Sequence, residues 1–65
     1  MDKEYIQGKI DEIKKEMDDP EVAHGMEDDL YAEFIEHISK REDSLGEMAK
    51  LVLTTEGLDF SRWFA

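Results

Sequence analysis

The chain has 65 residues and no cysteine, so neither a disulfide nor a thiolate zinc site can stabilise it. Eighteen acidic residues against eight basic ones give a formal net charge of −10 at pH 7. This charge disfavours direct binding to nucleic acid or to anionic membranes, and it favours a protein partner with a basic surface. No apolar run approaches the roughly 20 residues needed to cross a bilayer, and no signal-peptide pattern opens the sequence. We therefore expect a single cytoplasmic domain over residues 1–65.

The first predicted element is an amphipathic helix over residues 3–17. Its apolar positions are Ile6, Ile10, Ile13 and Met17, which recur at steps of four, three and four and so form one stripe. Lysines and carboxylates fill the other sides of the helix. A further possibility is that the apolar surface of this helix mediates self-association into a homo-oligomer.

A second helix is predicted over residues 20–41. Asp19 is suited to cap the free amides at the start of this helix. Pro20 lacks a backbone N–H, but at the first helical position that group would have no partner within the helix. Residues 20–43 hold eight acidic residues and only two basic ones, which makes this the acidic part of the chain. We expect four of these acids to form a water-facing surface that binds the partner: Asp28, Asp29, Glu33 and Glu36.

A third helix is predicted over residues 45–56. Ser44 and Glu47 match the capping-box pattern at its start, and Gly57 stands where a left-handed residue would end it. This segment is the most apolar of the chain, so we expect the helix to be largely buried.

The last predicted element is a short helical turn over residues 60–64. Asp59 can cap this turn, and the aromatic residues within it are expected to dock against the helices. The predicted fold class is therefore all-α, a small three-helix bundle with a short C-terminal helical turn.

One group of residues could carry chemistry. His24, Glu27 and Asp28 stand at i, i+3 and i+4, so they share one side of the second helix and could bind a divalent metal or relay a proton. A metal site would need further ligands from another element. The favoured interpretation is structural, with His24 hydrogen-bonded near the helix start and one of the acids paired with Arg62.

No other pattern indicates catalysis. The row Asp29, Glu33 and His37 repeats the helical spacing and is interpreted as a solvated side of the helix. The serines stand at helix ends and caps, and the four glycines are too far apart to form a phosphate-binding loop. We predict no catalytic residue, no cofactor and no enzymatic activity.

The order of several short motifs carries a resemblance. They are Asp19-Pro20-Glu21, Ala23-His24, Glu27-Asp28, Leu30, Phe34-Ile35, Ala49-Lys50, Val52-Leu53, Thr55, Phe60, Arg62-Trp63 and Ala65. Over residues 19–65 the chain resembles short, uncharacterised proteins from bacteriophages and bacterial genomes that share an Ala-His followed by acids and an Arg-Trp-aromatic-Ala tail. The resemblance implies a phage or prophage setting. It also implies a single structural cluster of His24, Glu27, Asp28, Arg62 and Trp63.

The function predicted from these patterns is that of a non-enzymatic, acidic protein-interaction module in the cytoplasm of a bacterial host cell. In its most specific form, the acidic surface imitates the phosphates of DNA and inhibits or modulates a nucleic-acid-binding host protein. The alternative is a protein that binds a metal or small ligand through His24, Glu27 and Asp28, with the site completed across a dimer interface.

Overall fold

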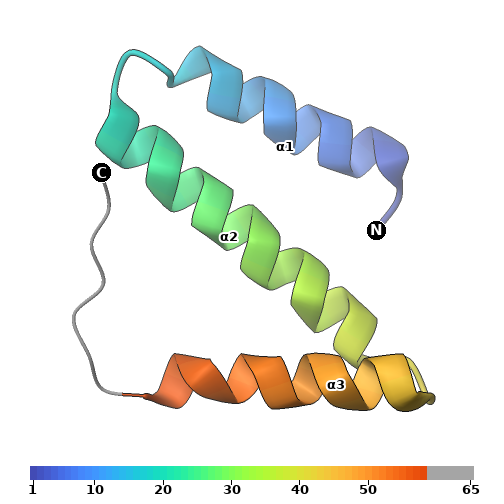
Figure 1. The fold of residues 1–65 in the computed structure, drawn as a ribbon. Coiled ribbons are helices and arrows are strands. Elements are labelled where there is room, and N and C mark those ends of the chain that lie inside the picture. The colour runs from blue at the N-terminus through green and yellow to red at the C-terminus, as the bar shows by residue number, and fades with distance from the viewer. Residues whose placement is uncertain (59–65) are drawn as a thin grey trace.

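The computed structural model describes residues 1–58, which form three α-helices and one short 3-10 helix (Figure 1). The helices are α1 (Lys3–Lys15), α2 (Pro20–Ser39), α3 (Ser44–Leu53) and η1 (Thr54–Gly57). The predicted all-α class with three helices is confirmed. The turn predicted over residues 60–64 lies outside the described residues, as do Arg62 and Trp63.

An aspartate side chain caps the start of each α-helix. Asp2, Asp19 and Asp43 each accept a hydrogen bond from the backbone amide three residues further along the chain. The oxygen–nitrogen distances are 2.9, 3.4 and 3.0 Å respectively. Pro20 occupies the first position of α2, so the predicted start of that helix is confirmed.

The start of α3 differs from the prediction, because the capping residue is Asp43 and not Ser44. The Asp43 carboxylate accepts the Gly46 amide hydrogen, and its Oδ2 lies 2.6 Å from Nη2 of Arg41. A carboxylate held by a guanidinium group is a stronger acceptor at a helix N-terminus than a serine hydroxyl. Ser44 therefore becomes the first residue of the helix, and the predicted capping box with Glu47 is replaced by the aspartate cap.

The helices also end earlier than predicted. The last residue of α1 is Lys15 instead of residue 17, and the last residue of α2 is Ser39 instead of residue 41. Met17, predicted as the fourth residue of the apolar stripe, therefore lies outside α1 and is 67 % exposed. Where α3 gives way to η1, the Thr54 hydroxyl donates to the Leu51 carbonyl at 2.6 Å, which satisfies a carbonyl at the helix end. Gly57 does not act as a left-handed terminator, because none of the described glycines has a positive φ.

The three helices form a single layer that looks like a reversed letter Z in Figure 1, with α2 as the diagonal. The Cα trace measures 39 × 33 × 10 Å. Within the described residues α2 contacts both α1 and α3, whereas α1 and α3 do not contact each other. Each outer helix is therefore covered by a neighbour on one side only.

Small residues make the closest contact in this layer. Among the described residues only Ser39, Gly46 and Ala49 are buried, and all three lie where α3 crosses the end of α2. The prediction that the third helix is largely buried is wrong. Its larger apolar side chains remain exposed because α2 covers one side of α3 alone; these are Leu45, Met48, Leu51 and Val52.

Candidate functional site

Acidic side chains of α1 and α2 gather on one side of the layer. A helix turns by about 100° per residue, so Asp29, Glu33 and Glu36 fall on the same side of α2. Asp2 and Glu12, from the α1 side, line the same two adjoining hollows as these three acids. The term acidic face is used below for Asp2, Glu12, Asp29, Glu33 and Glu36.

Glu33 is at the centre of the acidic face, since it lines both hollows. The Tyr5 hydroxyl of α1 donates to Oε1 of Glu33 at 2.7 Å, and this hydrogen bond raises the pKa of Tyr5. Nζ of Lys9 lies 5.5 Å from the centre of the Tyr5 ring and 3.7 Å from Oε2 of Glu12. Side chains of α1 thus hold the central acid of α2 in place.

The contribution of α1 to this face does not follow from the helical spacing of the acids on α2. The signal was present, because Tyr5, Lys9 and Glu12 each directly precede an isoleucine of the apolar stripe. On a helix the residue before a buried position lies at the edge of the buried stripe. Such residues can therefore reach over to the neighbouring helix.

The larger of the two hollows is of mixed charge. It has a volume of about 500 Å³, and Glu33 and Glu36 share it with the cationic side chain of Lys40 and with His37. The smaller hollow contains Asp29, Glu12 and Lys9. Carboxylates at this spacing can accept charge-assisted hydrogen bonds from several lysine or arginine side chains of a partner at once.

Asp28, the fourth acid predicted for the binding surface, lies apart from Glu33 and Glu36 and shares no hollow with them. It directly precedes Asp29 along the chain, and this step of one residue turns it by about 100° toward α3. It lines a hollow between α2 and α3 that also contains Asp29 and Glu56. The structure therefore brings together three of the four predicted acids and places Asp28 at their margin.

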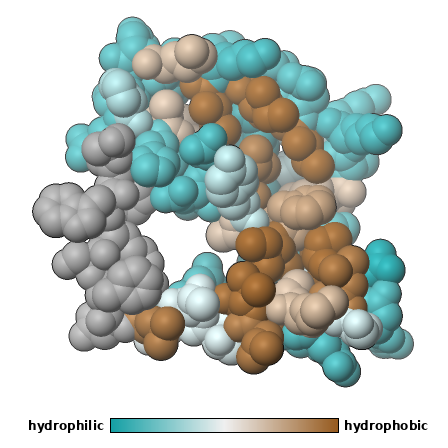
Figure 2. Space-filling model, in the orientation of Figure 1, coloured by the Kyte–Doolittle hydropathy of each residue, from teal (hydrophilic) through white to brown (hydrophobic). Residues whose placement is uncertain are grey.

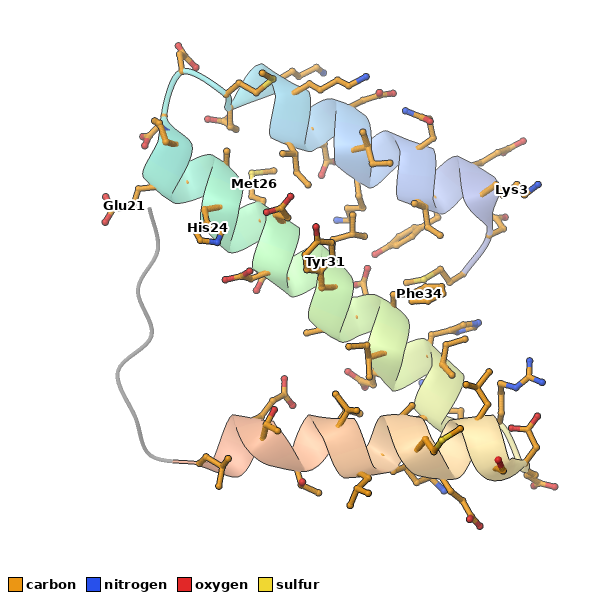
Figure 3. The ribbon with its side chains drawn as sticks, in the orientation of Figure 1. Lys3, Glu21, His24, Met26, Tyr31 and Phe34 are labelled. Carbon is orange, nitrogen blue, oxygen red and sulfur yellow. The ribbon has the colours of Figure 1, made fainter. Side chains whose placement is uncertain are left out.

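The group His24, Glu27 and Asp28 is only partly assembled. Nε2 of His24 lies 3.7 Å from Oδ1 of Asp28. The His24 side chain is on the opposite side of α2 from that of Met26 (Figure 3). Glu27 instead lies next to Tyr31, and its negative charge, together with a hydrogen bond, raises the pKa of the Tyr31 hydroxyl.

This arrangement bears on the metal-site alternative. Within residues 1–58, no three His, Cys, Asp or Glu side chains form a group that could hold a metal ion. The row Asp29, Glu33 and His37 is divided as well, since Asp29 and His37 line different hollows. The predicted pairing of Glu27 or Asp28 with Arg62 lies outside the described residues.

Comparison of the chain with protein-family models, with curated proteins and with solved structures finds no match. Among the helices of residues 1–58, none combines the length and the apolar character that crossing a bilayer requires. The interpretation of the acidic face therefore depends on its own geometry and charge.

Proposed function

We propose that this chain is a non-enzymatic protein-interaction module whose acidic face binds the basic surface of a partner protein. The observation that carries the proposal is the collection of five carboxylates, from α1, its capping residue and α2, on one side of a thin layer. The net charge of −10 adds a long-range attraction to any basic surface and repels nucleic acid.

A nucleic-acid-binding protein is the partner class that fits this charge pattern best. Such proteins carry rows of lysine and arginine that neutralise phosphates, and spaced carboxylates can occupy the same groups. In the phage or prophage setting that the sequence resemblance implies, the module would inhibit or modulate a host protein of this class in the bacterial cytoplasm.

The test uses a matched pair of double variants. Asp29→Asn/Glu36→Gln removes two charges from the acidic face and keeps the Tyr5–Glu33 hydrogen bond. Asp18→Asn/Glu42→Gln removes the same number of charges from the segments that connect the helices. The wild-type chain and both variants are immobilised and exposed to bacterial cell extract, with and without duplex DNA as competitor.

The wild type and the Asp18→Asn/Glu42→Gln control are expected to retain basic proteins at about 0.1 M salt and to release them at about 0.5 M, as screened ion pairs do. Duplex DNA is expected to displace the same proteins. The acidic-face variant should retain several-fold less. Equal retention by both variants, or retention that neither DNA nor salt weakens, would contradict the proposal.

A further inference from the structure

The side of the layer opposite the acidic face is apolar. Tyr31 and Phe34 stand two residues from Asp29 and Glu36 respectively, which turns them about 200° around α2. One hollow between α1 and α2 and a second between α2 and α3 open on this side and share Phe34. Figure 2 looks onto it and shows hydrophobic side chains in a band from α1 across α2 to α3. The term apolar face is used below for Ile10, Tyr31, Phe34, Leu45, Met48 and Val52.

The two hollows are large enough to receive side chains from another surface. The hollow between α2 and α3 has a volume of about 430 Å³ and is lined only by apolar residues. The hollow between α1 and α2 has a volume of about 420 Å³ and includes one cation and one anion, Lys14 and Glu27. Tyr31 remains 58 % exposed, Met48 55 % and Val52 51 %. A continuous apolar surface of this kind marks a site of association.

We propose that a second copy of this chain covers the apolar face, so that two single layers form one two-layer dimer. Helical domains bury their apolar stripes between at least two layers of secondary structure. Residues 1–58 supply one layer about 10 Å thick, in which no large side chain is fully buried. A second copy supplies the missing layer with a surface of the same size and the same apolar character.

The charge distribution is compatible with this pairing. When the apolar faces meet, the two acidic faces point outward in opposite directions. Packed helical layers are separated by about 8–10 Å, which places the acidic faces roughly 20 Å apart. This separation exceeds the Debye length of about 8 Å at physiological ionic strength, so repulsion between the acidic faces is largely screened.

The size and the margin of the apolar face also suit a symmetric dimer. The Cα trace extends 39 by 33 Å in its two long dimensions, so the outline of the layer does not limit an interface to less than the roughly 800 Å² that each partner buries in a standard one. In a two-fold dimer each surface meets its own copy. Lys14 and Glu27, which line the same hollow, then offer opposite charges to each other across the interface.

The experiment measures the mass of the purified full chain by sedimentation over a dilution series from about 500 µM to about 1 µM. We expect a species of twice 7.6 kDa at high concentration that dissociates on dilution. Because the layer gains most of its apolar burial on pairing, the Tm is also expected to rise with protein concentration. A mass of 7.6 kDa at every concentration overturns the proposal. The occupant of the apolar face would then be residues 59–65 or another protein, and not a second copy.

A matched pair of variants on α3 locates the interface. Met48→Lys places a charge on the apolar face and is expected to raise the dissociation constant at least about tenfold. Leu51→Lys places the same charge on the same helix at a side chain that is 70 % exposed and lines neither hollow, so the dimer should persist. A dimer that tolerates Met48→Lys, or that Leu51→Lys disrupts equally, overturns the assigned interface.

Circular dichroism at high protein concentration shows whether Met48→Lys keeps its helices. If it does not, Tyr31→Lys tests the same face from α2, with the same expected rise in the dissociation constant and the same overturning result. No partner protein and no change in the acidic face enters these measurements. Failure of the dimer therefore remains distinct from failure of the proposed binding of a basic partner.

Discussion

Gly46 is the residue at which α3 comes closest to the segment that precedes it. A Cβ added at this position would overlap the backbone carbonyl oxygen of Arg41. A backbone carbonyl in a short connection cannot move aside as the end of a flexible side chain can. Gly46 is therefore needed for the close approach of two backbone segments, although its φ is not positive.

We expect Gly46→Ala to lower the free energy of unfolding by about 1–3 kcal/mol, because the added carbon forces α3 away from the α2–α3 connection. Gly8→Ala is the control, since nothing lies within 4 Å of a Cβ added in the middle of α1. Alanine has a higher helix propensity than glycine, so Gly8→Ala should raise the free energy of unfolding by up to about 1 kcal/mol. Urea unfolding at equal protein concentration measures both changes, and a Gly46→Ala protein as stable as wild type would show that the Arg41 carbonyl imposes no restriction.

At the scale of the element, the start of α3 depends on a single carboxylate. The hydrogen bond from Arg41 and then the amide of Gly46 lower the pKa of Asp43 from its ordinary value. The folded state therefore favours the charged carboxylate more than the unfolded chain does. This contribution to stability is present above the unfolded pKa of about 3.9 and is lost as the pH falls through the lower pKa of the folded state.

Asp43→Asn keeps a side chain that can cap a helix but removes the charge that Arg41 holds. We expect its Tm to lie below that of the wild type at neutral pH, with the difference shrinking as the pH falls below about 4. Thermal melts over a pH series measure this difference directly. Glu42→Gln removes an equal charge beside the cap and should not lower the Tm at neutral pH. An Asp43→Asn protein that melts together with the wild type at neutral pH would rule out the charged cap.

At the scale of the whole molecule, the layer separates its two kinds of surface. The carboxylates of the acidic face lie on one side, and the side chains of the apolar face lie on the other. A chain with a net charge of −10 carries self-repulsion that opposes the compact state. On the acidic face, like charges one turn apart on α2 add to this repulsion.

Raising the salt concentration from about 0.02 M to about 0.3 M is therefore expected to raise the Tm of the wild type, because screening weakens the repulsion. The double variant Asp29→Asn/Glu36→Gln should show a smaller rise than Asp18→Asn/Glu42→Gln, although both lose two charges. Thermal melts at several salt concentrations provide the comparison. If the Tm of the two variants rises equally with salt, the acids of α2 contribute no more to the repulsion than the acids of the connecting segments do.

Much of the fold could be predicted from local patterns. The isoleucine stripe of α1 and the Asp19-Pro20 start of α2 act through neighbouring residues, so they appear in the structure as the sequence indicated. The start of α3 could not be predicted in the same way. Whether Asp43 or Ser44 caps that helix depends on Arg41, whose side chain reaches the aspartate only in the folded connection.

For the candidate site, the sequence determined which acids of α2 share a side, whereas for α1 it indicated only that Tyr5, Lys9 and Glu12 lie at the edge of the apolar stripe. Asp29, Glu33 and Glu36 share one side through helical periodicity alone, whereas Asp28 belongs to another side. That Tyr5 meets Glu33, 28 residues further along the chain, depends on how α1 packs against α2. No short-range pattern contains that information.

The sequence by itself determined the helical class, the helix starting at Asp19-Pro20 and the excess of negative charge, because each follows from composition or from interactions within a few residues. Only the tertiary structure decided that α3 is exposed and that the acidic and apolar faces lie on opposite sides of one layer. The physical reason is that helical periodicity gives each helix its polar and apolar sides, while packing between helices determines which of these sides is covered.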